Sequence, residues 1–275
     1  MSNGAVNPAS ALAKILRAVM HSGRASVEQG WTAALGAAPG SEEFARRHSE
    51  VVSLFRQVHA YVLSIEDDED RERNLRYVPH WYDAVVFRHG WNASNQPARN
   101  VIVETSLDQL ASLGSTLKRV SVFTDSLSDG EIANLRNSLD RWRELLDDAD
   151  LPVAIAEEIA VHVEHIDWLL RNIDTYGAKP VVDEAKKLLG TGITALQRRP
   201  GAVTKIAAAM GATVFFLTGT SHVVDSMNGV LEGLVHTRVV VEELIDGPKE
   251  IEQKKPLELP PGQSPTDSDR ESVGP

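Results

Sequence analysis

Three ionisable side chains in the second half of the chain have a spacing that metal sites use. Glu158, His162 and His165 follow one another at offsets of four and three residues. On an α-helix, which turns about 100° per residue, they share one stripe about 60° wide. Some helical bundles hold metal ions with inward Glu and His side chains, two of the helices carrying a Glu-x-x-His. No other helix shows a Glu-x-x-His, and Glu158 itself stands four residues before His162. An ordinary hydrogen bond from His162 to a neighbour therefore competes with the metal hypothesis.

A second set of candidates lies in the aromatic segment, residues 76–104, which holds five of the 15 aromatic residues. Aromatic walls with a few polar groups are typical of small-ligand sites, and loops often carry function. Trp and Tyr also close the ends of helical bundles, where their N–H and O–H groups reach water or backbone. The segment is therefore either a ligand or partner site, or a structural plug. The candidate residues are His80, Trp81, Tyr82, Asp83, His89 and Trp91.

Residues 202–245 contain two apolar stretches on either side of Gly219, which predicts a helical hairpin. The strongly apolar part of the first stretch is about 12 residues long. A bilayer core requires roughly 20 apolar residues, so a buried core hairpin is expected. Small residues in the first arm also permit close packing of the kind seen between membrane helices, which leaves membrane insertion as an alternative. The candidate residues for membrane or oligomer contact are Phe215, Phe216 and Leu217.

The elements that must position these residues are helices. Apolar residues recur every three or four positions along most of the chain. Capping boxes, in which Ser or Thr is followed three residues later by Glu or Gln, mark several helix starts. The pattern predicts an all-α, multi-helix bundle of about seven to ten helices. The predicted starts are Ser26 with Gln29, Ser41, Ser106 with Gln109, and Ser128 with Glu131.

Three stretches between the helical stripes are predicted to be connections or extended chain. The acidic residues 66–70 predict a solvated turn. Residues 124–130 are polar and short, which predicts that the helices on either side are antiparallel neighbours. Within the aromatic segment we expect a short helix after Pro79, an irregular loop at 90–97, and an extended piece at the β-branched residues 101–103.

Composition excludes several classes of function. The chain has no Cys, so it lacks a disulfide framework, an Fe–S cluster, a thiolate zinc site and a Cys nucleophile. Its formal charge of −11, from 39 acidic and 28 basic residues, disfavours binding to a phosphate backbone. The Gly-rich nucleotide motifs and the Gly-x-Ser-x-Gly of many hydrolases are absent. The first ten residues lack a basic patch followed by an apolar core, which predicts a cytoplasmic protein.

We divide the chain into a helical body, residues 1–246, with a sub-boundary considered near residues 76–104, and a tail, residues 247–275. The tail holds six of the 13 prolines and no aromatic residue, a composition that predicts disorder.

The expected function is that of a non-enzymatic interaction or regulatory protein with a protein partner, no nucleic acid and no cofactor. Membrane contact and a homo-oligomer stay open. The alternatives are a membrane-acting effector that uses residues 202–245, and an enzyme or ligand-binding protein with its site in residues 77–104.

Overall fold

The computed structural model describes residues 7–86, 96–120, 126–148, 151–199 and 202–219. This part of the chain is mainly helical and contains no β-strand, which confirms the all-α prediction. The predicted tail, residues 247–275, lies outside the described residues. The helices are α1 (Pro8–Met20), α2 (Val27–Leu35), α3 (Glu42–Leu63), α4 (Asp68–Leu75), α5 (Val78–Val86), the 3-10 helix η2 (Ala98–Asn100), α6 (Glu104–Val120), α7 (Asp129–Asp148), α8 (Val153–Arg171), α9 (Ile173–Tyr176), α10 (Ala178–Arg198) and α11 (Val203–Gly219).

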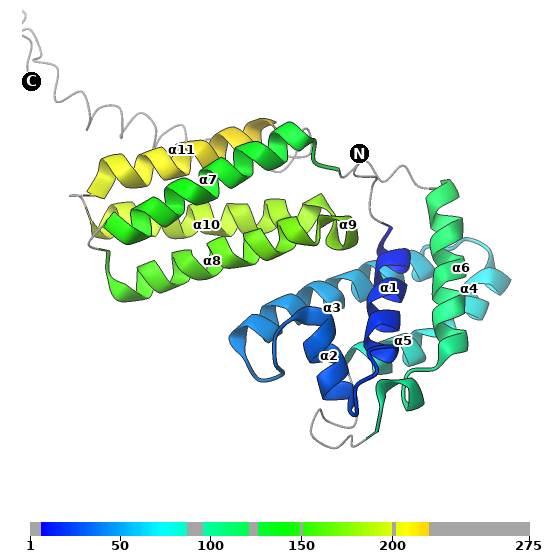
Figure 1. Ribbon diagram of the computed structural model, residues 1–275. Coiled ribbons are helices and arrows are strands. Elements are labelled where there is room, and N and C mark those ends of the chain that lie inside the picture. Colours follow the sequence, from blue (N-terminus) through cyan, green and yellow to red (C-terminus); the bar gives the residue numbers. More distant parts are fainter. Residues whose placement is uncertain (1–6, 87–95, 121–125, 149–150, 200–201, 220–275) are drawn as a thin grey trace, which may run out of the picture.

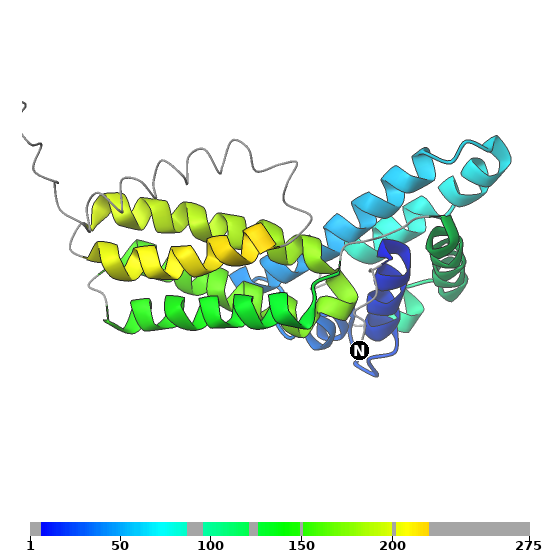
Figure 2. The same ribbon diagram turned by 90° about the horizontal axis from the view of Figure 1, so that it is seen from above.

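These helices gather in two groups that lie next to each other (Figure 1). The first group contains α1 to α6. In the second, α7 and α10 each contact both α8 and α11, which closes a four-helix bundle. Figure 2 shows these helices running side by side. The two groups meet where α3 packs against α8 and where α1 packs against α9.

The helix starts predicted at Ser26, Ser41 and Ser128 are confirmed. Ser26 Oγ and Ser41 Oγ each accept a hydrogen bond from the backbone N–H three residues on, at 3.2 and 3.1 Å. Ser128 forms a complete capping box: its Oγ accepts from the N–H of Glu131 at 3.2 Å, and the Glu131 carboxylate accepts from the N–H of Ser128 at 2.6 Å. These caps satisfy N–H groups that have no partner inside the first turn of a helix.

The start predicted at Ser106 is wrong, because α6 begins at Glu104. Ser106 Oγ donates to the carbonyl of Val103 at 2.6 Å. Gln109 Nε2 donates to Asn74 Oδ1 of α4, 3.2 Å away. A Ser hydroxyl near a helix start can bond backward as well as forward, so its spacing to Gln109 did not fix its direction.

Two predicted connections have other structures. Residues 66–70 do not form only a turn: Asp67 caps α4, and its carboxylate accepts from the N–H of Asp70 at 2.8 Å. Acidic side chains are favourable there because the helix N-terminus carries partial positive charge. Residues 101–103 are not extended, since the N–H of Ile102 donates to the carbonyl of Ala98 at 2.8 Å in a turn after η2. A β-branched run without a partner strand gains nothing from extension. The short helix expected after Pro79 is found within α5.

The prediction that the helices flanking residues 124–130 are antiparallel neighbours is wrong. α6 packs mainly against α1 in the first group, whereas α7 packs mainly against α11 in the second. The chain therefore passes from one group to the other between α6 and α7 (Figure 1). Residues 76–104, considered for a sub-boundary, lie before this crossing, within the stretch that spans α4 to α6.

The core of the second group fixes which side of α11 faces inward. Thr213 Oγ1 accepts from Trp142 Nε1 of α7 at 2.9 Å and lies 2.7 Å from Ser138 Oγ, and all three residues are buried. Trp142 also lies against Gly192 of α10, where an added Cβ would be 2.7 Å from the indole Cη2. Helices that approach this closely leave no room for a larger side chain.

Candidate functional site

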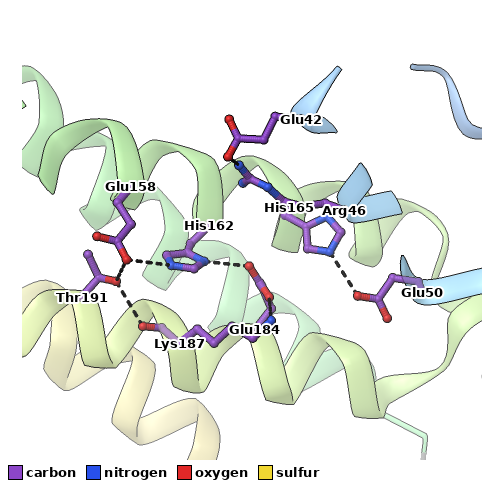
Figure 3. Close-up of polar contacts among 9 residues, drawn as sticks. All are labelled: Glu42, Arg46, Glu50, Glu158, His162, His165, Glu184, Lys187 and Thr191. Carbon is purple, nitrogen blue, oxygen red and sulfur yellow. Dashed lines mark hydrogen bonds and ion pairs between the residues drawn. The ribbon is translucent and has the colours of Figure 1, made fainter. Parts of the chain in front are cut away.

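The predicted stripe on α8 lies beside α10 and near α3 (Figure 3). His162 Nδ1 is 2.7 Å from Glu184 Oε1 on α10. Its Nε2 is 3.9 Å from Glu158 Oε1, one turn back on α8. The spacing of the stripe is compatible with a metal site and with an ordinary hydrogen bond from His162 to a neighbour. His162 makes such a hydrogen bond, to Glu184.

Glu184 is the most deeply buried charged residue of this cluster, with 4% of its surface exposed. Lys187 Nζ donates to its second oxygen at 2.9 Å. Burial alone would raise the pKa of Glu184, but the hydrogen bonds from His162 and Lys187 and their positive charge outweigh it and lower the pKa to about 2. The same contact with Glu184 raises the pKa of Lys187. Glu184 thus stays ionised throughout the physiological range.

His165 points away from His162 and toward the first group (Figure 3). Its Nε2 lies 3.3 Å from Glu50 Oε1 of α3, and its ring stacks on Trp168 with centroids 5.8 Å apart. Besides its contact with His162, Glu158 accepts from Thr191 Oγ1 of α10 at 3.1 Å. The three predicted metal ligands therefore do not converge on one point: Glu158 and His162 lie near each other, whereas His165 faces Glu50. Across the described ranges, no set of three or more His, Asp or Glu side chains is arranged to hold a metal ion.

Arg47 of α3 joins the two groups of helices. Its Nη1 donates to the carbonyl oxygens of Leu35 and Gly36, at 2.7 and 3.0 Å, where α2 ends. The guanidinium carbon lies 5.1 Å from the centre of the Trp168 ring of α8, a cation–π distance. Tyr176 of α9 also contacts Trp168, with ring centres 4.8 Å apart. Its buried hydroxyl has a raised pKa, from desolvation first and then from the charge of Glu50.

A small pocket of about 240 Å³ opens beside this junction. Its volume is below the roughly 300–1,000 Å³ of usual small-molecule sites, and its walls are charged where such sites are mainly apolar. Arg46 forms an ion pair with Glu42, and Arg47 with Glu43. The walls are therefore stabilised by contacts within the chain. The lining residues are Glu42, Glu43, Arg46, Arg47, Val161, Glu164 and His165.

The four described candidates of the aromatic segment have different surroundings. Trp81 is fully buried, and its Nε1 donates to the carbonyl of Ser106 at 2.7 Å, as expected for a structural plug. Tyr82 is 48% exposed and packs on Phe55. His80 is exposed and Asp83 is half-buried. His89 and Trp91 lie outside the described residues.

The three apolar candidates on α11 divide between two sides of the helix. Phe216 and Leu217 are buried in the bundle, each with 1% of its surface exposed, whereas Phe215 is 65% exposed. The second arm of the predicted hairpin, residues 220–245, lies outside the described residues. Phe215 belongs to an exposed stripe with four-three-four-three spacing, which we call the outer face of α11. This face consists of Thr204, Ala208, Gly211, Phe215 and Thr218.

Sequence reasoning missed the partners of the two histidines. Glu184 is 22 positions from His162, and Glu50 is 115 positions from His165. No local pattern marks either residue, since both lie on amphipathic helices as ordinary acidic positions. Arg47 and Trp168 were missed for the same reason.

Neither a known protein family, nor a curated protein, nor a solved structure matches this chain. Among the described residues, no helix combines the length and the apolar character that crossing a bilayer requires.

Proposed function

We propose that this protein acts by binding another protein and that the outer face of α11 is its contact surface. The observation that carries the proposal is Phe215, a large aromatic side chain that is 65% exposed on a stripe without any charged residue. Aromatic residues, Phe among them, are enriched at protein interfaces relative to the rest of the surface. The expected partner is an amphipathic helix with apolar side chains every three or four residues.

The shape of this face supports a helical partner. Nothing lies within 4 Å of the position where Gly211 would carry a Cβ. Ala208 is also exposed and small. Small side chains let two helix backbones approach closely, and Phe215 then provides a knob for a facing groove. α11 thus offers both a close approach and an anchor.

The polar cluster at the junction favours binding over catalysis. His162 and Lys187 are bonded to Glu184, and His165 lies against Glu50. A general acid or base must reach a substrate proton within hydrogen-bond distance. These groups instead hold α3, α8 and α10 together, and the small pocket beside them has paired charges on its walls.

The test is capture of the full-length protein's partners from its native host, followed by binding of the purified pair. We expect Phe215→Asp to weaken binding by about 30-fold or more, the cost of losing an interface anchor. Val153→Asp is the matched control, because Val153 is 72% exposed at the start of α8. Equal binding by both variants and the unmodified protein would contradict the proposal.

We also propose that the protein resides in the cytoplasm. Fractionation of host cells tests this compartment.

An exposed Phe on a helix face whose own residues carry no charge also favours one alternative, contact with a lipid surface. Leakage and sedimentation with neutral and anionic vesicles between about pH 5 and pH 8 would test it, the range in which His residues titrate. Leakage that Phe215→Asp abolishes and Val153→Asp preserves would support the membrane alternative and contradict the protein partner.

A further inference from the structure

Arg141 of α7 lies at the edge of the outer face of α11. The two helices pack side by side along most of their length (Figure 1). Arg141 Nη1 donates to the carbonyl oxygen of Ala208 at 3.4 Å. Ala208 is itself one of the residues of the outer face. A positive charge is therefore held beside a stripe whose own residues carry no charge.

This charge has no acidic partner in the part of the chain that the structure describes. The contact of Arg141 with Ala208 is longer than the usual N–H···O distance of about 2.7–3.2 Å. The nearby Arg143, by contrast, forms ion pairs with Asp140 and Asp167 at 2.8 and 2.9 Å. Arg141 is also exposed, which leaves N–H donors for a carboxylate from outside. A guanidinium can bind a carboxylate through two parallel N–H groups.

We infer that the partner helix carries an acidic residue beside its apolar stripe, and that this residue binds Arg141 while Phe215 contacts the stripe. The inference rests on the proposed function of the outer face of α11. It adds the charge of the partner and the position of that charge. A charged pair at the rim of an apolar contact fixes the register of two helices and disfavours partners of like charge.

The spacing of the two contacts sets where the acidic residue lies. Ala208 and Phe215 are seven residues apart on α11, a distance of about 10 Å along its axis. A partner helix that runs along α11 has the same rise per residue. Its acidic residue is therefore expected about two turns from the side chains that contact Phe215. Gly211 lies between the two contacts and has open space at its Cβ position, so the partner backbone can come close there.

The net charge of the protein makes this inference specific. The formal charge of the chain is −11. Long-range attraction alone would therefore favour a basic partner. A preference for acidic residues beside the stripe would be a local effect of Arg141, opposite in sign to the attraction of the whole molecule.

Peptide selection on the full-length protein tests the inference. The probe is a displayed library of amphipathic helical peptides of about 20 residues, with a constant leucine stripe and randomised flanking positions. We expect enriched peptides to carry Asp or Glu on one flank of the stripe. Against Arg141→Glu the preference should change to Lys or Arg, and a selected acidic peptide should bind at least about tenfold more weakly.

Arg136→Glu is the matched control. Arg136 is also exposed on α7, but at about 100° per residue it lies opposite Ser138, which faces α11. This variant should select the same acidic peptides as the unmodified protein. Both substitutions change exposed side chains, so far-ultraviolet circular dichroism should be the same for all three proteins.

The outcomes separate the inference from the proposed function. Enriched peptides without an acidic preference, or with one that Arg141→Glu leaves unchanged, would overturn the inference and keep the contact surface. Peptides that bind Phe215→Asp equally well, or no enriched peptide at all, would contradict the proposed function and the inference with it. Arg141-dependent binding to anionic vesicles in place of peptides would assign the face to a lipid surface and overturn both.

Discussion

Glu184 keeps its negative charge although it is almost completely enclosed by α8 and α10. A buried carboxylate is costly unless charged hydrogen bonds compensate its desolvation. His162 and Lys187 provide these bonds from two sides, at 2.7 and 2.9 Å. The charge therefore holds α8 and α10 in one register, and its loss should be measurable as a change of stability with pH.

The pKa of Glu184 is about 2 in the folded protein, against an ordinary value of 4.5. Between these pH values the unfolded chain binds more protons, so the contribution of Glu184 is complete above pH 4.5 and is lost as the pH falls toward 2. We expect Glu184→Gln to lower the free energy of unfolding at pH 7 by roughly 2–3 kcal/mol and to reduce its fall in this window. Urea unfolding at a series of pH values measures both.

Glu157→Gln is the matched control for this experiment, because Glu157 is an exposed Glu of the neighbouring helix α8. Its effect on stability should stay within about 0.5 kcal/mol. The same pH profile for Glu184→Gln and for the unmodified protein would show that the contact with His162 and Lys187 is not maintained in solution.

Thr213 makes a second residue-scale prediction. Thr213→Val keeps the shape of the side chain but leaves Trp142 Nε1 without its acceptor and Ser138 Oγ without its partner on α11. Buried polar groups without partners cost about 1–3 kcal/mol each, so thermal or urea unfolding should show a loss of at least that size. Thr116→Val, at an exposed position of α6, should change stability little.

At the scale of one element, α10 contains two glycines with opposite surroundings. Gly190 has nothing within 4 Å of an added Cβ, whereas Gly192 would bring a Cβ to 2.7 Å from Trp142 and 3.0 Å from Met210. Ala is the better helix former by about 1 kcal/mol when space allows. The same substitution in one helix should therefore have opposite signs.

We expect Gly190→Ala to stabilise the protein by about 0.5–1 kcal/mol. Gly192→Ala should destabilise it by about 1–3 kcal/mol, since Trp142 is fully buried and cannot move without cost. Melting temperatures and urea midpoints of the two variants measure the difference. Equal stabilisation by both would mean that α7, α10 and α11 are not packed this closely.

At the scale of the whole molecule, Arg47 links the end of α2 to Trp168 of the second group. Its guanidinium satisfies two carbonyl groups at a helix C-terminus, where a positive charge is favourable. Together with the Trp168 contact, this makes Arg47 the central residue of the junction. The small pocket lies beside it.

Arg47→Ala should weaken the junction while leaving the helices of each group folded. We expect a loss of about 1–3 kcal/mol in the free energy of unfolding. The radius of gyration in small-angle scattering should increase, with little change in far-ultraviolet circular dichroism. Arg46→Ala is the control, since its ion pair is with Glu42 of its own helix. Unchanged scattering for Arg47→Ala would show that other contacts hold the groups together.

The sequence by itself determined the helices and several of their ends. Ser26, Ser41 and Ser128 cap as predicted, because capping and helix formation depend on residues within one turn. The sequence also showed that Glu158, His162 and His165 share one side of a helix, the side on which His162 contacts Glu184. Its errors at Ser106 and at residues 66–70 concern side chains that can bond in two directions, or that can either end or begin a helix.

Only the tertiary structure decided which stripes meet. The sequence placed α6 and α7 side by side, whereas each packs on a helix from elsewhere in the chain. It also selected Phe215 and Phe216 together, and only the packing of α11 on α7 showed that one is buried and the other exposed. Apolar spacing fixes a helix and its faces, but every apolar face attracts every other with little direction. The choice between partners then follows from side-chain shape and polar contacts such as Trp142 with Thr213, which no local pattern contains.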